Sequence, residues 1–143
     1  MQNILDLKLK LEEQAKMSYA NQRQELNRQE QKLELLRTDK RRLEEEGRRL
    51  RLNRLSPLSM RENATGIEYM DGLIDRQCLA VRREEAKLED CRQKLEKVVK
   101  ERKAQEKLRE HAFEQFLRDE NAAESKVIDE LTSYTYGARQ LTR

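Results

Sequence analysis

Residues 26–59 read LNRQEQKLELLRTDKRRLEEEGRRLRLNRLSPLS, and this stretch decides the fold. Leucines recur in it at steps of three or seven residues, which place their side chains on one narrow stripe of an α-helix. The leucines of this stripe are Leu26, Leu33, Leu36, Leu43 and Leu50. The pattern stops at Leu55-Ser-Pro-Leu-Ser59, which holds the only proline of the chain. Because proline disfavours helical geometry in the residue before it, we expect a long helix to end here.

The break after this helix is predicted to span about residues 54–66, because Asn63-Ala-Thr-Gly66 follows the proline closely. Ser56 is a good N-cap residue and Pro57 suits a first helical turn, so the break can hold one short turn of helix. Asp71-Gly72 is a weaker alternative site for the chain reversal.

The apolar stripe continues on both sides of the break. Before the break it includes Ile4, Leu7, Leu11, Ala15 and Tyr19. After the break it includes Ile67, Met70, Ile74, Val81, Leu88, Leu95, Val98, Ala112, Phe116, Ala123, Val127 and Leu131. A narrow heptad stripe on otherwise charged helices is typical of a coiled coil. We therefore predict an all-α fold, a long two-helix antiparallel coiled-coil hairpin forming a single domain over residues 1–143.

The predicted helices cover about residues 2–53 and about residues 67–136, because Gly137 fits a C-terminal stop. With a reversal centred near residue 60, Ile4 meets Phe116 and the chain beyond about residue 118 overhangs. This overhang carries Val127, Ile128, Leu131, Tyr134 and Tyr136. Unpartnered apolar side chains suggest a docking surface. The alternatives are that the overhang frays, or that residues preceding this sequence cover it.

Composition supports an elongated helical protein over a compact globule. Of 143 residues, 41% are charged and 36% hydrophobic, with four Tyr, two Phe and no Trp to anchor a core. The net charge is +3, but it is unevenly distributed. Residues 37–54 contain eight basic and four acidic side chains, whereas residues 119–131 contain five acidic side chains and Lys126. The two regions carry opposite local fields and so can serve different partners.

The sequence shows no motif typical of a catalytic, metal-binding or cofactor-binding site. Cys78 and Cys91 are 13 residues apart, so they face different sides of a helix and form neither a metal pair nor a redox motif. His111 is the only histidine, and phosphate-binding and calcium-binding motifs are absent from the sequence. We expect no catalytic residue, no cofactor and no metal, and therefore no enzyme.

Nucleic-acid binding and membrane insertion are also disfavoured by the pattern. Glu44-Glu45-Glu46 interrupts the basic run, which has no aromatic residues interleaved for base stacking. No stretch is apolar enough to span a membrane. A helix lying on a membrane would need the apolar stripe that the partner helix already occupies.

Four segments, in order along the whole chain, resemble the FliJ family, small coiled-coil proteins of the flagellar type III export apparatus. They are MQNILDLKLKLEEQAK at residues 1–16, GIEYMDGLI at 66–74, LEKVVKERKAQEKLRE at 95–110 and ESKVIDEL at 124–131. The last matches a family signature of the form E-x-K-x-hydrophobic-D-E, ending in Asp129 and Glu130.

The resemblance implies a non-enzymatic coupling subunit, similar in fold to the central stalk of rotary ATPases. It implies that the end carrying both termini binds the hexameric flagellar export ATPase and promotes its assembly and activity. The turn end would contact the cytoplasmic domain of the export gate membrane protein, and export chaperones are further partners. The implied location is the cytoplasm, at the cytoplasmic face of the cell membrane at the flagellar base.

Site residues carry over by position. The export-gate contact at the turn end is expected at Tyr69, Leu73, Leu36 and Leu43. The ATPase contact at the terminal end is expected at Phe113, Phe116, Glu124, Lys126, Val127, Asp129, Glu130 and Leu131. Each assignment has a structural alternative. The three leucines can simply pack in the apolar stripe between the helices, and Tyr69 can be a side chain that closes the turn by packing across it. Asp129 and Glu130 can simply be exposed acidic residues near a helix end.

Two other functions stay open at this point. A generic tether or spacer would dimerise along a continuous helix, whereas a hairpin satisfies its own stripe and should be monomeric when free. A stalk subunit of an ordinary rotary ATPase is disfavoured, because such stalks usually carry a further domain in the middle and the break here is too short to hold one.

Overall fold

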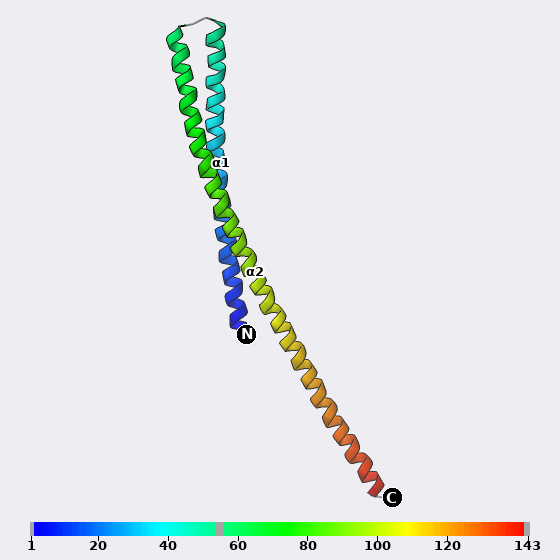
Figure 1. Cartoon of the computed structure of the whole chain (residues 1–143). Helices are drawn as coiled ribbons and strands as arrows, with labels where there is room; N and C mark the ends of the chain where they lie inside the picture. The colour runs from blue at the N-terminus through cyan, green and yellow to red at the C-terminus, as the bar shows by residue number, and fades with distance from the viewer. Residues whose placement is uncertain (1, 54–55, 142–143) are drawn as a thin grey trace. The chain divides into compact units, whose positions relative to one another are not determined.

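The chain folds into two long α-helices in a computed structural model that describes residues 2–53 and 56–141. Helix α1 spans Gln2–Leu52 and helix α2 spans Pro57–Leu141. The described residues contain no β-strand, and α1 packs antiparallel against α2 (Figure 1). The predicted all-α helical hairpin is therefore confirmed. Arg54 and Leu55, which belong to the predicted turn and, for Arg54, to the basic run, lie outside the described residues.

Ser56 caps the second helix, as its sequence context predicts. Its Oγ accepts a hydrogen bond from the backbone N–H of Leu58 at 3.2 Å, and its carbonyl accepts one from Met60 at 3.2 Å. The predicted helix start near residue 67 is wrong, because α2 begins at Pro57 and includes Asn63-Ala-Thr-Gly66. Asn63 is a helical residue whose amide donates to the Leu43 carbonyl of α1 at 2.8 Å.

Gly137 does not end α2, contrary to the prediction from its position. The helix continues to Leu141, and Gly137 does not adopt the left-handed backbone that a glycine helix stop requires. Gly47 and Gly72 also lie inside helices.

The contacts of the chain group into two units, residues 11–98 and residues 1–10 with 99–143. In the first, the turn-side unit, both helices bury a stripe that alternates steps of three and four residues. The stripe on α1 comprises Ala15, Tyr19, Gln22, Leu26, Gln29, Leu33, Leu36, Lys40, Leu43, Gly47 and Leu50. The stripe on α2 comprises Asn63, Ile67, Met70, Ile74, Gln77, Val81, Glu84, Leu88, Cys91, Leu95 and Val98. This alternation is the heptad geometry of a coiled coil.

The centre of the turn-side unit is a small hydrophobic cluster of Leu26, Leu33 and Val81. Ile74, Cys78 and Leu88 of α2 pack against this cluster. Even these central side chains keep 6–8% of their surface exposed, because two helices cannot enclose a residue completely.

The register between the helices differs from the prediction. Gln29 contacts Gln77, rather than a residue near Cys91 as a reversal centred at residue 60 requires. The earlier reversal follows directly from the start of α2 at Pro57. The predicted meeting of Ile4 with Phe116 is consequently wrong.

In the second, the terminal unit, the first turns of α1 pack on α2 through side chains other than those predicted. Leu5 is buried, and Lys8 forms an ion pair with Glu101 at 3.1 Å. Ile4 and Leu7, predicted to lie in the stripe, are 48% and 55% exposed. The prediction that Leu11 lies in the stripe is also wrong. In the turn-side unit, the neighbouring Glu12 is buried and Leu11 is exposed.

The part of α2 that does not pack against α1 begins earlier than residue 118. Every residue from Lys107 to Arg139 is exposed except Gly137, which is half-buried. The cause is again the register, because each residue of α1 meets a residue of α2 that lies closer to the turn than predicted.

Candidate functional site

Two sets of predicted contact residues lie in different units of the chain. We call Leu36, Leu43, Tyr69 and Leu73 the turn-end surface, and Phe113, Phe116, Glu124, Lys126, Val127, Asp129, Glu130 and Leu131 the terminal surface. The turn-end surface belongs to the turn-side unit and the terminal surface to the terminal unit.

Only Tyr69 of the turn-end surface is freely available to a partner. Its side chain is 63% exposed, whereas Leu36, Leu43 and Leu73 are half-buried. Leu36 and Leu43 lie on the buried stripe of α1, and the Leu43 side chain approaches α2 at Gly66. The two leucines of α1 therefore hold the helices together, and Tyr69 is the residue of this set that projects outward.

The turn-side unit also has a basic groove, which the sequence analysis did not predict as a site. Arg37, Lys40, Arg41 and Glu44 of α1 and Ile74 of α2 line it. Lys40 reaches across the helices to Asp71 at 2.6 Å, and this hydrogen-bonded carboxylate raises the pKa of Lys40. The sequence signal was the basic run of residues 37–54, but the contribution of α2 could not be placed without the register.

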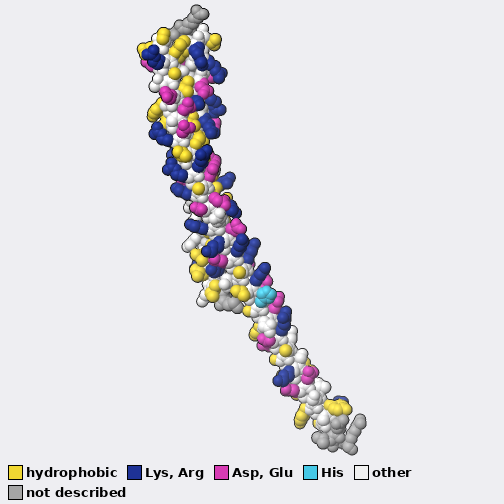
Figure 2. All heavy atoms as spheres, in the orientation of Figure 1, with side chains coloured by type: hydrophobic (Ala, Val, Ile, Leu, Met, Phe, Trp, Pro, Cys, Tyr) yellow, Lys and Arg dark blue, Asp and Glu magenta, His cyan; other side chains and the backbone are white. Residues whose placement is uncertain are grey.

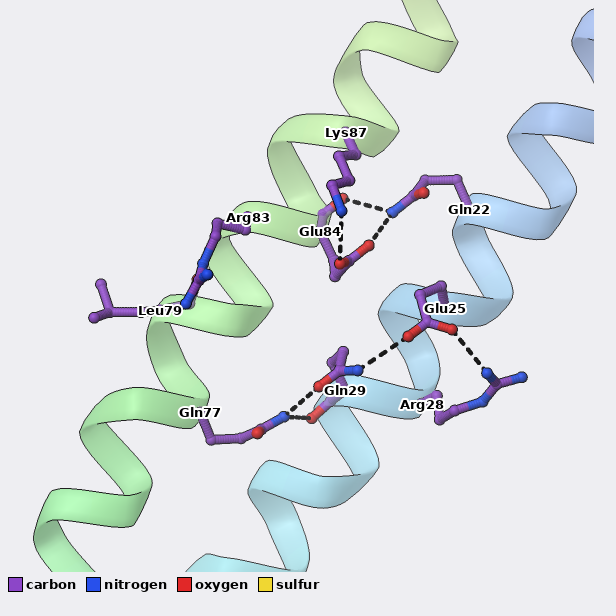
Figure 3. Close-up of polar contacts among 9 residues, drawn as sticks. All are labelled: Gln22, Glu25, Arg28, Gln29, Gln77, Leu79, Arg83, Glu84 and Lys87. Carbon is purple, nitrogen blue, oxygen red and sulfur yellow. Dashed lines mark hydrogen bonds and ion pairs between the residues drawn. The ribbon is translucent and has the colours of Figure 1, made fainter.

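Two polar layers interrupt the hydrophobic stripe of the turn-side unit (Figure 3). Gln22 donates to the backbone carbonyl of Glu84 at 3.2 Å and to the Glu84 carboxylate, and Gln77 donates to Gln29 at 2.8 Å. The amide of Gln22 stabilises the charged carboxylate, and the pKa of Glu84 lies below its ordinary value of 4.5. Hydrogen-bonded polar layers fix which turns of the two helices face each other.

All eight residues of the terminal surface are exposed. The large hydrophobic members, Phe113, Phe116, Val127 and Leu131, expose 54–61% of their surface. Further large hydrophobic residues on the same part of α2 are exposed too, namely Leu108, Leu117, Ile128, Tyr134 and Tyr136. Figure 2 shows such side chains among charged ones along the C-terminal part of α2. Exposed apolar side chains of this number are a feature that docking surfaces often share.

Shallow hollows and negative charge accompany these hydrophobic residues. Glu120, Ala123, Glu124, Val127 and Ile128 line one hollow, and Ile128, Leu131, Thr132, Thr135, Tyr136 and Arg139 line the next. Residues 110–130 carry seven acidic side chains and two basic ones, Arg118 and Lys126. The surface is thus complementary to apolar side chains within positively charged surroundings.

The part of the chain that the structure describes presents no arrangement typical of catalysis. Its residues contain no group of three or more side chains able to hold a metal ion. Cys78 and Cys91 are free thiols, and the His111 side chain is 76% exposed beside Glu114. Neither described helix contains a stretch long and apolar enough to cross a membrane.

The fold defines a class of protein: an all-α hairpin of two long helices with the heptad stripe of a coiled coil. Within that class, the model of the flagellar FliJ protein family matches residues 1–141, and the chain belongs to this family. It is therefore a component of the flagellar protein export apparatus. No curated protein and no solved structure gives a significant match to the chain.

Proposed function

We propose that this chain is a non-enzymatic coupling subunit whose terminal surface binds the hexameric flagellar export ATPase and promotes its assembly and activity. The observation that carries the proposal is the exposed hydrophobic set on α2, which includes Val127 and Leu131 and has no covering helix among the described residues. Burying such side chains in a partner is favourable by about 25 cal/mol per Å² of apolar area.

The turn-end surface contacts the cytoplasmic domain of the export gate in this proposal, with Tyr69 as the projecting residue. Exposed aromatic side chains are frequent anchors of protein interfaces, and Tyr69 is 63% exposed. The basic groove around Lys40 and Arg41 offers complementary charge for acidic residues of that partner. Export chaperones are further partners, and the complex works in the cytoplasm at the membrane face of the flagellar base.

ATP hydrolysis by the cognate export ATPase, measured with and without this chain, tests the proposal. The wild-type chain should increase turnover and shift the ATPase toward hexamers in light scattering. The variant Val127→Ser/Leu131→Ser should lose most of this stimulation, because it removes two exposed hydrophobic side chains of the terminal surface.

Leu35→Ser is the matched control, because Leu35 is 66% exposed but belongs to α1 in the turn-side unit. It should stimulate the ATPase like the wild type. Equal stimulation by both variants would contradict the ATPase assignment of the terminal surface.

The proposal includes a monomeric state for the free chain, because α1 and α2 of one chain already occupy each other's heptad stripes. Light scattering of the chain alone measures this state. A stable dimer would favour the alternative of a tether or spacer.

A further inference from the structure

The turn end carries an unusual run of sequence that the proposed gate contact does not use. Residues 47–61 contain no acidic residue, which makes them the longest acid-free run in a chain that is 41% charged. Four described arginines lie within this run, and all are exposed: Arg48, Arg49, Arg51 and Arg61. None of the four forms an ion pair with any residue of 2–53 or 56–141.

Two leucines stand beside these arginines at the ends of the helices. Leu52, the last residue of α1, is 82% exposed, and Leu58, in the first turn of α2, is 62% exposed. Leu52 is the most exposed large hydrophobic side chain in the described chain. We call these four arginines and two leucines the basic tip.

The arrangement of the arginines favours a broad anionic surface over a docking site on one face of a helix. At about 100° per residue, Arg48, Arg49 and Arg51 point in three directions around α1. A globular partner on one side of the helix would reach only some of them. All of these arginines can reach a flat anionic surface that meets the tip end-on. If an apolar layer lies beneath the charges of that surface, the two leucines can enter it.

We propose that the basic tip adsorbs to the surface of a lipid bilayer containing acidic phospholipids. Positive side chains are attracted to an anionic leaflet, and two exposed leucines add shallow apolar burial. The binding is peripheral, since neither described helix can cross a membrane. It also leaves the coiled-coil stripe intact, because the tip residues lie outside the hydrophobic cluster around Leu26. The inference does not depend on the proposed ATPase or gate contacts.

Co-sedimentation of the full chain with vesicles tests this inference. Vesicles of phosphatidylcholine mixed with phosphatidylglycerol should bind the chain at low salt, and vesicles of phosphatidylcholine alone should not. Arg48→Gln/Arg49→Gln should weaken binding about 30-fold, because each basic residue near an anionic membrane contributes about a factor of five. Leu52→Ser/Leu58→Ser should weaken it by about tenfold through lost apolar burial.

Arg82→Gln/Arg83→Gln is the matched control. Arg82 and Arg83 are adjacent, exposed arginines of α2, so this variant removes the same amount of positive charge at a place away from the tip. It should bind vesicles nearly as the wild type does, and circular dichroism should show all variants to be helical. Equal weakening by the control would show diffuse attraction and overturn the assignment to the tip.

A protein partner would give a different result from a membrane. If the chain ignores anionic vesicles but binds the purified cytoplasmic domain of the export gate through Arg48 and Arg49, the tip recognises a protein and the lipid inference is wrong. Failure of ATPase stimulation would leave the vesicle result unaffected, so the two proposals fail separately.

Discussion

The side-chain amide of Asn63 occupies the space that the missing side chain of Gly47 leaves between the helices. A Cβ atom at Gly47 would lie 2.5 Å from Asn63 Oδ1, while Asn63 Nδ2 donates to the Leu43 carbonyl at 2.8 Å. The glycine therefore permits a close interhelical contact one helical turn from the end of α1. Although glycine weakens a helix, at this position it makes room for the packing of Asn63.

Gly47→Ala is expected to destabilise the hairpin although alanine favours helix. Helix propensity alone would stabilise by about 1 kcal/mol, but the added methyl group must displace Asn63, at a cost of about 1–3 kcal/mol. Thermal unfolding followed by circular dichroism measures the change. Gly137→Ala is the control, since nothing lies within 4 Å of its added Cβ. It should be neutral or stabilising, and a gain in stability for Gly47→Ala would refute the close contact.

Leu26→Ala should lower the free energy of unfolding by about 2–3 kcal/mol, the lower part of the range for buried leucines. Leu26 is 6% exposed in the central cluster, but a two-helix layer collapses more easily around a cavity than a thick core does. Urea denaturation measures the loss. Leu35→Ala, at a site 66% exposed, should change stability by less than about 0.5 kcal/mol. Similar losses at both sites would show that the observed stripe does not carry the packing.

The Gln22–Glu84 layer should make the free energy of unfolding depend on pH in the acidic range. The lowered pKa of Glu84 means that the folded state favours the carboxylate, so this stabilisation is complete above pH 4.5 and is lost as pH falls through the folded-state value. Gln22→Ala removes the donor and should destabilise the chain at neutral pH more than in acid. Melting temperatures across this range measure the difference. Gln24→Ala, at an exposed site, should show no such pH dependence, and a pH-independent loss in Gln22→Ala would argue against the linkage.

The Lys40–Asp71 pair joins the helices beside the basic groove and should tolerate an exchange of charges. Lys40→Glu places three acidic groups together, with Asp71 and Glu44, and should lower the melting temperature. Lys40→Glu/Asp71→Lys should recover much of the loss. In the wild type the raised pKa of Lys40 gives stabilisation that is full below pH 10.5 and is lost as pH rises through the folded-state value. No recovery in the double variant would exclude a pairwise contact.

A chain cut after Arg118 should lose ATPase stimulation while its hairpin remains helical. The cut removes Val127, Leu131 and the acidic side chains around them but none of the buried stripe. ATP turnover and circular dichroism measure the two properties separately. Undiminished stimulation would show that the removed segment is dispensable, and loss of helicity in the remainder would mean that it supports the fold.

The leucine stripe of residues 26–50 suffices to predict the coiled coil, because those leucines do form the interhelical layer. The start of α2 cannot be read in the same way. Asn63-Ala-Thr-Gly66 has the composition of a turn, and only the contact of Asn63 with Leu43 explains its place in a helix. At the first turns of α1, exposed Ile4 and Leu7 imitate a stripe, whereas the side chains that pack are Leu5 and Lys8.

The candidate surfaces also divide into features that the sequence predicts and features that it does not. The exposure of Val127 and Leu131 can be predicted, because any hairpin with helices of unequal length leaves part of one unpaired. The basic groove cannot, because it combines Lys40 of α1 with Ile74 of α2 and so requires the register. That register depends on contacts of charged and amide side chains, whose partners a heptad pattern does not specify.

The cap at Ser56 also has a consequence for the order in which the chain folds. It places the start of α2 a few residues after the end of α1, so the interhelical contact of Asn63 with Leu43 closes a loop of only 20 residues. The Lys8–Glu101 pair joins residues 93 positions apart. Because the entropy lost on loop closure grows with loop length, pairing should nucleate beside the turn and proceed like a zipper, with the contacts of Leu5 and Lys8 last to close and first to open.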